Sequence, residues 1–496
     1  MCRGNLDPTM IKQYFPTSLL LWLLGVVLVL APNITIITTQ YIYYLYDTQR
    51  FLEIILLVAT ALLLVLNSRN REAWIVFFSH LSFRTKFSLS IFFLLGSISS
   101  TISATLPKYA FQELSLFALL SLLTIGIASQ VHLYGKFVRK FLIAALFVGT
   151  VLISWHFVLD IFFCTQSNEN YCLNRAEYFY RFTNHRFFNQ FQSWTFPILA
   201  LPFLLYSNRV GRWRGLLAIP SVVWWSVWLH SGGRGTGLAL IVGSLAAWLI
   251  FKKRAHAWLS FQCLTGLAGV VLYFSTFYAL SSSLESSIGI LETGLVRGLS
   301  PIRPEMWLAS LDMAYSNFLL GIGPQHYAFF HPIASISHPH SAIAQQLAEW
   351  GFPASSAAIF LLVSGLLAWI QITTTQDSQG SSNEEKYIPV TITASFFGAL
   401  AHAQVSGVLV MPLSQIMGSV IIGLMLSYIP KKTITGPKLP SRFKTILFNV
   451  AVLSLACILL WSIFPQVNQI NLINATQQPS GILHPRFWIQ GQIDQY

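Results

Sequence analysis

Residues 445–464 read T-I-L-F-N-V-A-V-L-S-L-A-C-I-L-L-W-S-I-F, an apolar run without one charged side chain. A helix of about 20 apolar residues is long enough to cross the roughly 30 Å of hydrocarbon in a bilayer. Lipid offers no hydrogen bonds to open backbone, so a crossing segment must be a helix or part of a closed barrel. Barrel strands alternate apolar and polar residues in shorter segments. This run therefore predicts a transmembrane helix.

Runs of the same kind recur along the chain. Of its 496 residues, 54% are hydrophobic and 9% are charged, whereas soluble proteins carry about 25% charged residues. We predict an all-α, polytopic membrane protein that forms a single membrane-embedded domain over residues 1–496, with about 12–14 transmembrane helices. Thirteen crossings are expected, at residues 17–39, 50–67, 87–106, 110–129, 137–160, 187–206, 215–230, 237–251, 257–279, 350–372, 388–407, 412–429 and 445–464.

The basic residues predict how the chain is threaded through the membrane. The net charge is +13, and with the N-terminus in the cytoplasm only nine of the 30 Lys and Arg residues fall in outer loops. These nine are Arg50, Lys108, Arg175, Arg181, Arg186, Arg234, Arg297, Arg303 and Arg486. Because cytoplasmic loops carry the excess of Lys and Arg, a cytoplasmic N-terminus is predicted. The Lys and Arg residues of the inner loops are interpreted as a topology signal and as contacts with membrane lipids. No nucleic-acid-binding module is found.

The first apolar run has no small-residue cleavage site and is long enough to span, so no cleavable signal peptide is expected. Either Met1 or Met10 could be the start of the protein.

Two cysteines share one polar outer loop. For Cys164 and Cys172, an oxidising compartment favours a disulfide, and two separate thiols are the alternative. Cys263 and Cys457 lie in apolar helices and are expected to be packing residues.

One polar stretch, residues 280–349, interrupts the apolar pattern and predicts a long outer loop. The polar C-terminal tail, residues 466–496, is also expected outside. Within the loop, residues 304–318 predict a short helix, because Pro304 suits a first helical turn and Glu305 is favourable there.

The segment Gly321-Ile322-Gly323-Pro324 is expected to end this helix. Residues 325–339 show no periodicity and predict irregular backbone. His340 then directly precedes a second helix, on which Ser341, Gln345 and Glu349 fall on one face.

His338 and His340 flank Pro339 at the mouth of a membrane helix. A single histidine is more often a structural residue, but a pair on the outer side suits proton abstraction from an incoming hydroxyl. Zinc is the competing functional interpretation. We do not favour it, because no carboxylate, cysteine or third histidine stands at ligand spacing, and no metal site is predicted.

Arg234 lies in the glycine-rich segment S-G-G-R-G-T-G, residues 231–237, at the outer end of a helical hairpin. An arginine at the hydrocarbon edge is costly unless it meets an anion, and its paired donors match phosphate oxygens. Snorkelling to the interface is the alternative. Arg297 and Arg303 are either solvated surface charges or partners of Arg234 around a lipid diphosphate. No D-x-D motif offers metal ligands, so arginine would stabilise such a leaving group.

A third polar cluster is Asn184-His185-Arg186 with Asn189, Gln190 and Gln192. It is interpreted either as a hydrogen-bond network inside the bundle or as the lining of a sugar or acceptor cavity.

Residues 303–327 read R-P-E-M-W-L-A-S-L-D-M-A-Y-S-N-F-L-L-G-I-G-P-Q-H-Y, and H-P-H-S-A-I-A-Q-Q-L-A-E-W-G-F follows at 338–352. This pattern resembles the signature of the O-antigen ligase/polymerase superfamily of membrane glycosyltransferases. The matching positions are Arg303, Trp307, Gly321, Gly323, His340, Glu349 and Gly351, and the S-x-x-R-G segment with Arg234 is similar to a second motif of that family. Ser341 replaces the usual Asn.

The resemblance implies a metal-independent, inverting transfer of a glycan from undecaprenyl diphosphate at the periplasmic face of the bacterial inner membrane, without a cofactor. The family's essential histidine corresponds to His340, and its arginines to Arg234 and Arg303, with Arg297 a weaker correspondence. The implied acceptor is lipid A–core in an O-antigen ligase, a pilin or other protein in an O-oligosaccharyltransferase, or the growing chain in a polymerase. The ligase is the first expectation. A transporter or flippase for a lipid-linked sugar is the rival class.

Overall fold

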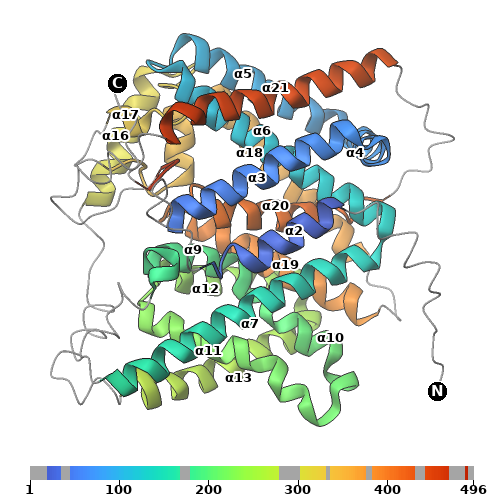
Figure 1. The fold of residues 1–496 in the computed structure, drawn as a ribbon, viewed down its shortest axis with the longest axis vertical. Coiled ribbons are helices and arrows are strands. Elements are labelled where there is room, and N and C mark those ends of the chain that lie inside the picture. The colour runs from blue at the N-terminus through green and yellow to red at the C-terminus, as the bar shows by residue number, and fades with distance from the viewer. Residues whose placement is uncertain are drawn as a thin grey trace.

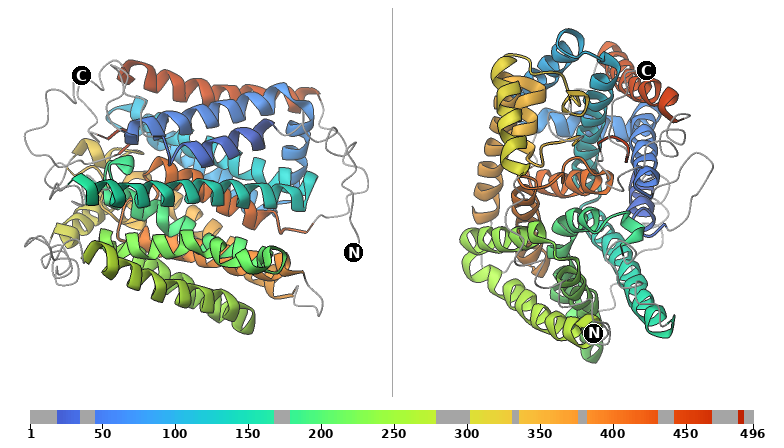
Figure 2. Two further views of the ribbon diagram at one scale, coloured as in Figure 1. Left: turned by 60° about the horizontal axis from the view of Figure 1, so that its bottom comes forward. Right: turned by 90° about the vertical axis from the view of Figure 1, so that its left-hand side faces the viewer.

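The structure is a computed structural model that describes residues 19–34, 45–167, 179–278, 302–330, 336–375, 382–430, 442–467 and 486–489. Every regular element within these ranges is a helix. The all-α prediction is therefore confirmed, and the helices lie side by side in one bundle (Figures 1 and 2).

The longer helices are α2 (Leu19–Leu30), α3 (Leu45–Leu66), α4 (Ser68–His80), α5 (Phe83–Ile102), α6 (Pro107–Tyr134), α7 (Lys136–Ser167), α9 (His185–Thr195), α10 (Ala200–Val210), α11 (Ile219–Ser231), α12 (Arg234–Phe251), α13 (His256–Tyr273), α16 (Ile302–Ser316), α18 (Ala342–Thr375), α19 (Asn383–His402), α20 (Pro412–Leu426) and α21 (Arg442–Val467).

Seven stretches of the described residues are long and apolar enough to cross a membrane. They are Leu45–Leu66, Phe83–Ile102, Pro107–Tyr134, Lys136–Phe163, Arg234–Thr276, Ala342–Thr375 and Arg442–Gln466. Two shorter apolar helices, α2 and α20, add to them. The chain is thus a polytopic membrane protein. Each of the thirteen predicted crossings overlaps a helix, although the number of crossings itself stays a prediction.

The crossing expected at 187–206 is not one straight helix. α9 ends at Thr195, a 3₁₀ turn follows at Phe196–Leu199, and α10 begins at Ala200. Pro197 lies in that turn, and a proline has no N–H to donate to an α-helical ladder. The interruption leaves α9 as a separate short helix at one end of the bundle.

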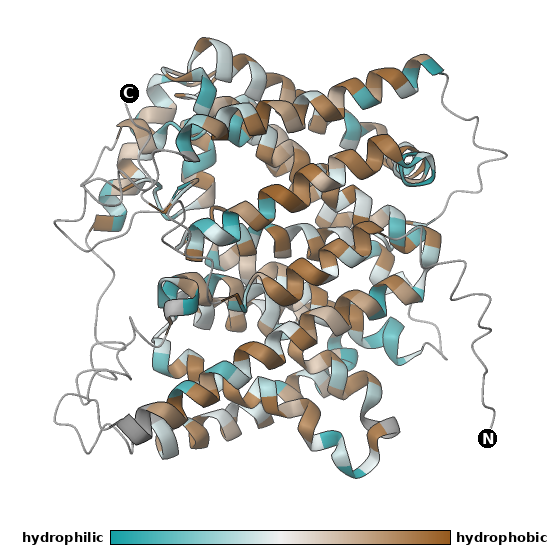
Figure 3. Ribbon diagram, viewed as in Figure 1, coloured by the Kyte–Doolittle hydropathy of each residue, from teal (hydrophilic) through white to brown (hydrophobic). Residues whose placement is uncertain are grey.

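The outer surface of the helices is apolar. Leu66, Phe83 and Phe464 are 77–79% exposed, and Figure 3 shows brown, hydrophobic stretches along helices whose ends are teal. Such a surface suits contact with lipid tails. Cys263 and Cys457 belong to it. Both are exposed, so the expectation that they pack inside the protein is wrong.

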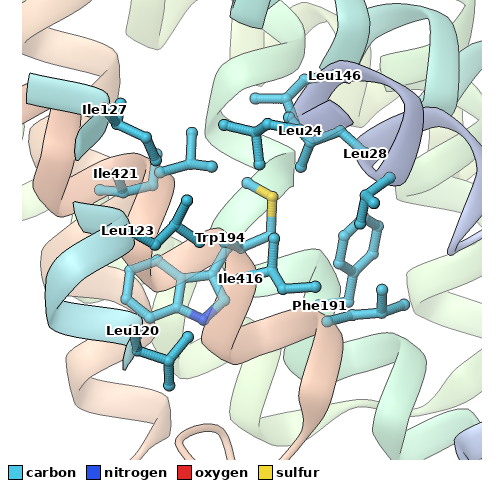
Figure 4. Close-up of a cluster of buried hydrophobic side chains, with 14 of the residues drawn as sticks. Leu24, Leu28, Leu120, Leu123, Ile127, Leu146, Phe191, Trp194, Ile416 and Ile421 are labelled. Carbon is cyan, nitrogen blue, oxygen red and sulfur yellow. The ribbon is translucent and has the colours of Figure 1, made fainter. Parts of the chain in front are cut away.

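The core lies where five helices meet. Figure 4 shows the Trp194 ring of α9 among side chains of α2, α6, α7 and α20, including Leu120, Leu123, Ile416 and Leu24. These residues are buried, and burial of each large apolar side chain contributes about 1.5–3 kcal/mol. This packing fixes α9 against α2, α6, α7 and α20.

Two short helices lie at the left-hand end of the bundle in Figure 1, α16 and α17 (Tyr327–Phe330). α16 packs on α18. It begins and ends two residues earlier than the predicted helix at 304–318. The stretch predicted as irregular, 325–339, contains α17, and its residues 336–339 are irregular.

Several predictions fall on parts of the chain that are not described. They concern residues 280–301 with Arg297, nearly all of the tail 466–496, the side chains of Cys164 and Cys172, and the start at Met1 or Met10.

Candidate active site

The glycine-rich turn between α11 and α12 places Arg234. Gly232 ends α11 in the left-handed conformation, at φ 61°, where glycine has no steric penalty. A Cβ on Gly233 would lie 2.4 Å from Asn189 Nδ2, and one on Gly235 would lie 2.1 Å from His402 Nε2. Because these two glycines have no Cβ, Asn189 of α9 and His402 of α19 can pack directly against the turn. The Arg234 side chain is exposed.

Hydrogen bonds lock this turn to its neighbours. The Thr236 hydroxyl donates to the Asn189 carbonyl at 2.9 Å, and the Ser231 hydroxyl donates to the Asn189 side-chain oxygen at 2.9 Å. Ser193 Oγ and His402 Nδ1 lie 2.7 Å apart. The start of α12 is thus held by α9 and the end of α19.

The remaining amides of α9 also have internal partners. Gln190 donates to Ser406 Oγ at 2.7 Å, and Gln192 donates to the Trp224 carbonyl at 3.1 Å. Of the two interpretations of the cluster at 184–192, the geometry of Asn189, Gln190 and Gln192 matches a hydrogen-bond network inside the bundle.

Three arginines gather beside this turn. Arg303, the second residue of α16, is half-buried. Its burial and the positive charges of Arg186 and Arg234 together hold the pKa of its guanidinium below the ordinary value. Like charges that are close enough to interact repel one another. An anion bound among the three guanidinium groups would relieve that repulsion. The Arg303 charge also acts on His402.

Arg186 was not assigned to the anion site from the sequence. It is exposed in the first turn of α9, where its backbone N–H donates to the Asn184 side chain at 2.8 Å. The available signal was an arginine just inside an outer helix N-terminus, which is an end that favours anions. Nothing in the spacing of residues 186, 234 and 303 shows that they meet.

His338 and His340 form a compact pair. Their ring centroids lie 4.3 Å apart at 69°. Trp307 Nε1 of α16 donates to the Pro339 carbonyl between them at 3.1 Å. His340 has φ +54°, a left-handed conformation that costs about 1–3 kcal/mol in a residue with a side chain. The turn that carries His340 is therefore held in place by α16.

The two histidines differ in burial. His338 is 3% exposed and packs on Gly407, where a Cβ would lie 2.5 Å from His338 Nε2. His340 is only partly buried. Of the two rings, His340 is the one that a substrate can reach.

The start of α18 joins the histidines to the arginine cluster. The Ala342 N–H donates to the Ala403 carbonyl at 2.9 Å, directly after His402. Ser341 Oγ accepts from the Ala344 N–H at 3.4 Å, so it caps the start of α18. Through the end of α19, the predicted Arg234 and His340 thus lie at one end of the bundle.

The G-x-G turn crosses the backbone of α18. Gly321 and Gly351 both have positive φ, at 68° and 75°, and a Cβ on Gly351 would lie 2.7 Å from the Gly321 nitrogen. The Ile322 and Gly323 N–H groups donate to the carbonyls of Ala348 and Glu349 at 2.9 and 3.0 Å. Gly321 and Gly351 thus allow the two backbones to approach closely, at the point where α18 is interrupted.

Glu349 is fully buried. Its carboxylate accepts from the Tyr327 N–H at 3.0 Å and from Gln345 at 3.3 Å, and it pairs with Arg486 at 2.5 Å. From the sequence, Arg486 is recognised only as one of the nine outer charges. With these partners, Glu349 is a structural residue that supports the loop.

His326 is likewise held by backbone. The Leu106 N–H donates to its Nε2 at 2.9 Å, and its Nδ1 lies 2.8 Å from the Pro324 carbonyl. Among the described residues, no group of three or more His, Cys, Asp or Glu side chains is placed to hold a metal ion.

Comparison with known proteins points to one family. A family model described as O-Antigen ligase matches residues 219–372. The matched segment contains Arg234, Arg303, His338, His340 and Glu349, together with all of α16 and α18 up to residue 372. None of the curated proteins compared matches the chain.

Proposed function

Residues 219–372 of this membrane protein belong to the O-antigen ligase superfamily, and we propose that the chain transfers a glycan from undecaprenyl diphosphate to an acceptor hydroxyl at the periplasmic face of the inner membrane. The favoured acceptor is lipid A–core, which would make the protein an O-antigen ligase. The observation that carries the proposal is that Arg234 and His340 both lie beside the end of α19: Gly235 packs on His402, and the Ala342 N–H donates to the Ala403 carbonyl.

A lipid diphosphate fits the three arginines. Each guanidinium offers paired N–H donors that match phosphate oxygens. The N-termini of α9 and α12 lie at Arg186 and Arg234, and helix N-termini favour negative charge. The apolar helix surface lets the polyprenyl tail stay in the bilayer while its headgroup reaches this cluster.

The histidine pair fits the acceptor. His340 takes the proton of the acceptor hydroxyl, whose oxygen attacks the anomeric carbon of the donor sugar. The bond from that carbon to the diphosphate oxygen breaks, its electron pair leaves with the diphosphate, and the arginines stabilise the charge. His338 orients the His340 ring, and Trp307 fixes the turn through the Pro339 carbonyl. No step requires a bound metal ion.

The proposal is tested with purified protein, a lipid-diphosphate-linked glycan and lipid A–core. His340→Ala should lower the turnover number about 10²- to 10⁴-fold, the range for loss of a general base, with an unchanged melting temperature. His256→Ala is the matched control, because His256 is exposed at the start of α13, which follows the far end of α12. Full transfer by the His340→Ala variant would remove the assigned base.

The anion site has its own test. Arg234→Lys keeps the charge and loses the paired donors, so donor affinity should fall roughly 10- to 100-fold, or about 1.5–3 kcal/mol. Arg212→Lys, an exposed arginine at the opposite end of the bundle, should leave affinity unchanged. Equal affinity for the donor in both variants would contradict the diphosphate site.

The acceptor is identified by measuring transfer to three candidates with the same preparation. The candidates are lipid A–core, a pilin-type protein and the glycan chain itself. Transfer to lipid A–core alone supports the ligase. Transfer to protein or chain extension would replace it by the oligosaccharyltransferase or the polymerase. Movement of the donor across vesicles without any transfer would favour a flippase.

A further inference from the structure

A short piece of the C-terminal region, residues 486–489, lies inside the bundle. The side chains of Phe487, Trp488 and Ile489 are at most 5% exposed. The Ile489 N–H donates to Asp47 at 2.9 Å, and Arg50 Nε donates to the Phe487 carbonyl at 3.0 Å. α3 therefore holds this segment through its backbone.

Arg486 leads this segment and is 3% exposed. Its Nη2 donates to both oxygens of Glu113, at 3.0 and 2.7 Å, and to Glu349 Oε2 at 2.5 Å. One guanidinium thus joins α6, which carries Glu113, to α18, which carries Glu349. Removing one partner of a buried ion pair leaves an uncompensated charge, so both carboxylates depend on Arg486.

Glu349 stands at the end of a short rigid piece of α18. Residues 342–350 are helical, and the helix is interrupted at Gly351. At the start of this piece, two residues after His340, the Ala342 N–H donates to the Ala403 carbonyl. Nine residues of helix span about 13 Å. If residues 342–350 can tilt at the Glu349 end, the turn that carries His340 at the other end therefore moves with them.

The loop that crosses this piece is fixed by the same carboxylate. Glu349 Oε1 accepts from the Tyr327 N–H, and the Glu349 carbonyl accepts from the Gly323 N–H. α16 reaches Pro339 from the other side through Trp307. The ion pair between Arg486 and Glu349 thus fixes the Glu349 end of residues 342–350. The Trp307 contact reaches only the turn before the other end.

We propose that Arg486 is a positioning residue for the transfer reaction: the buried segment 486–489 delivers it to Glu113 and Glu349, and this anchor sets the orientation of His340. The catalytic part of this inference rests on the proposed function. Arg486 does not touch the reacting atoms, so its loss should lower the turnover number and leave the KM for the donor unchanged.

The positioning itself can be measured without any substrate. In the full-length protein, Arg486→Gln should speed hydrogen exchange of the amides at 322, 323 and 327, which bond to α18. Arg254→Gln is the matched control. Arg254 ties the other end of α18 to α19 by donating to the Thr373 and Glu385 carbonyls at 3.2 and 3.1 Å, so its loss should speed exchange near 373 and 385 and leave 322–327 unchanged.

The catalytic consequence is measured by transfer kinetics on the same variants. A displacement of about 1 Å can cost about 10²-fold in rate, so Arg486→Gln should lower the turnover number about 10- to 100-fold at constant KM. Arg486→Lys keeps a charge for one carboxylate and should recover part of that loss. Arg254→Gln should retain the wild-type turnover number.

The outcomes separate the two hypotheses. Unchanged exchange at 322–327 in Arg486→Gln overturns the positioning role, whatever the activity. Faster exchange with a wild-type turnover number, or an equal loss in Arg254→Gln, shows that the anchor does not set the reaction and also overturns the proposal. Absence of any transfer by the wild-type protein contradicts the proposed function, while the exchange result still decides whether Arg486 positions α18.

Discussion

Single residues decide the geometry of the histidine loop. Gly351 combines φ 75° with ψ 171° in the middle of α18, and its neighbour across the crossing, Gly321, also has positive φ. A side chain at either position meets backbone, which cannot move aside as a flexible side chain can. The sequence motif therefore reports a contact between two backbones rather than a contact with substrate.

Gly351→Ala should destabilise the protein. The strained backbone conformation costs about 1–3 kcal/mol for a residue with a Cβ, and that Cβ would lie 2.7 Å from the Leu319 carbonyl oxygen. Gly365→Ala is the control in the same helix, because a Cβ there meets nothing within 4 Å, and it should stabilise by about 0.5–1 kcal/mol. Melting temperatures in one detergent check both, and a Gly351→Ala protein as stable as Gly365→Ala would contradict the crossing.

At the scale of secondary-structure elements, the sequence predicted the features that depend on residues close together in the chain. The apolar runs predicted the helices, and Pro304 with Glu305 predicted α16 to within two residues. The meeting of Arg186, Arg234 and Arg303 was only partly foreseen, because it depends on packing of α9, α12 and α16 across long separations. α17 was missed because four residues give no periodicity. Arg486 gave no signal, since its partners lie on two distant helices.

The loop that holds α17 should be sensitive to acid. Burial, then the positive charge of Arg486, lowers the pKa of His326 below its ordinary value. The folded loop therefore keeps the ring neutral, while the unfolded chain binds a proton near pH 6.5. Stability from this site is complete above that pH and is lost as the pH falls towards the lowered pKa, by at most about 1.4 kcal/mol per pH unit.

The measurement is the melting temperature between pH 7.5 and 5.5. The wild-type protein should melt earlier at the lower pH, and His326→Gln, which cannot take up that proton, should show a smaller drop. An equal drop in the two proteins would show that His326 does not contribute to the acid sensitivity.

At the scale of the whole molecule, the apolar surface and the seven candidate spans show a membrane protein. The orientation of the chain stays a prediction from its basic loops. It can be tested at two exposed side chains at opposite ends of the bundle, Tyr315 in α16 at 85% exposure and Trp213 between α10 and α11 at 56%.

In a variant with the five native cysteines replaced, Tyr315→Cys should react with a membrane-impermeant maleimide in intact spheroplasts. Trp213→Cys should react only after the membrane is permeabilised. Labelling in the reverse order would invert the predicted topology and would place the arginine cluster in the cytoplasm.

The buried segment at 486–489 also bears on biogenesis. Tyr46 donates to the Arg486 carbonyl at 2.8 Å across 440 residues of sequence. The ribosome delivers α6 and α18 to the translocon before this segment, so Glu113 and Glu349 enter the membrane without their shared cation. A nascent chain thus lacks this ion pair until residues 486–489 have been synthesised, and the intervening period is when chaperones or quality-control proteases would meet it.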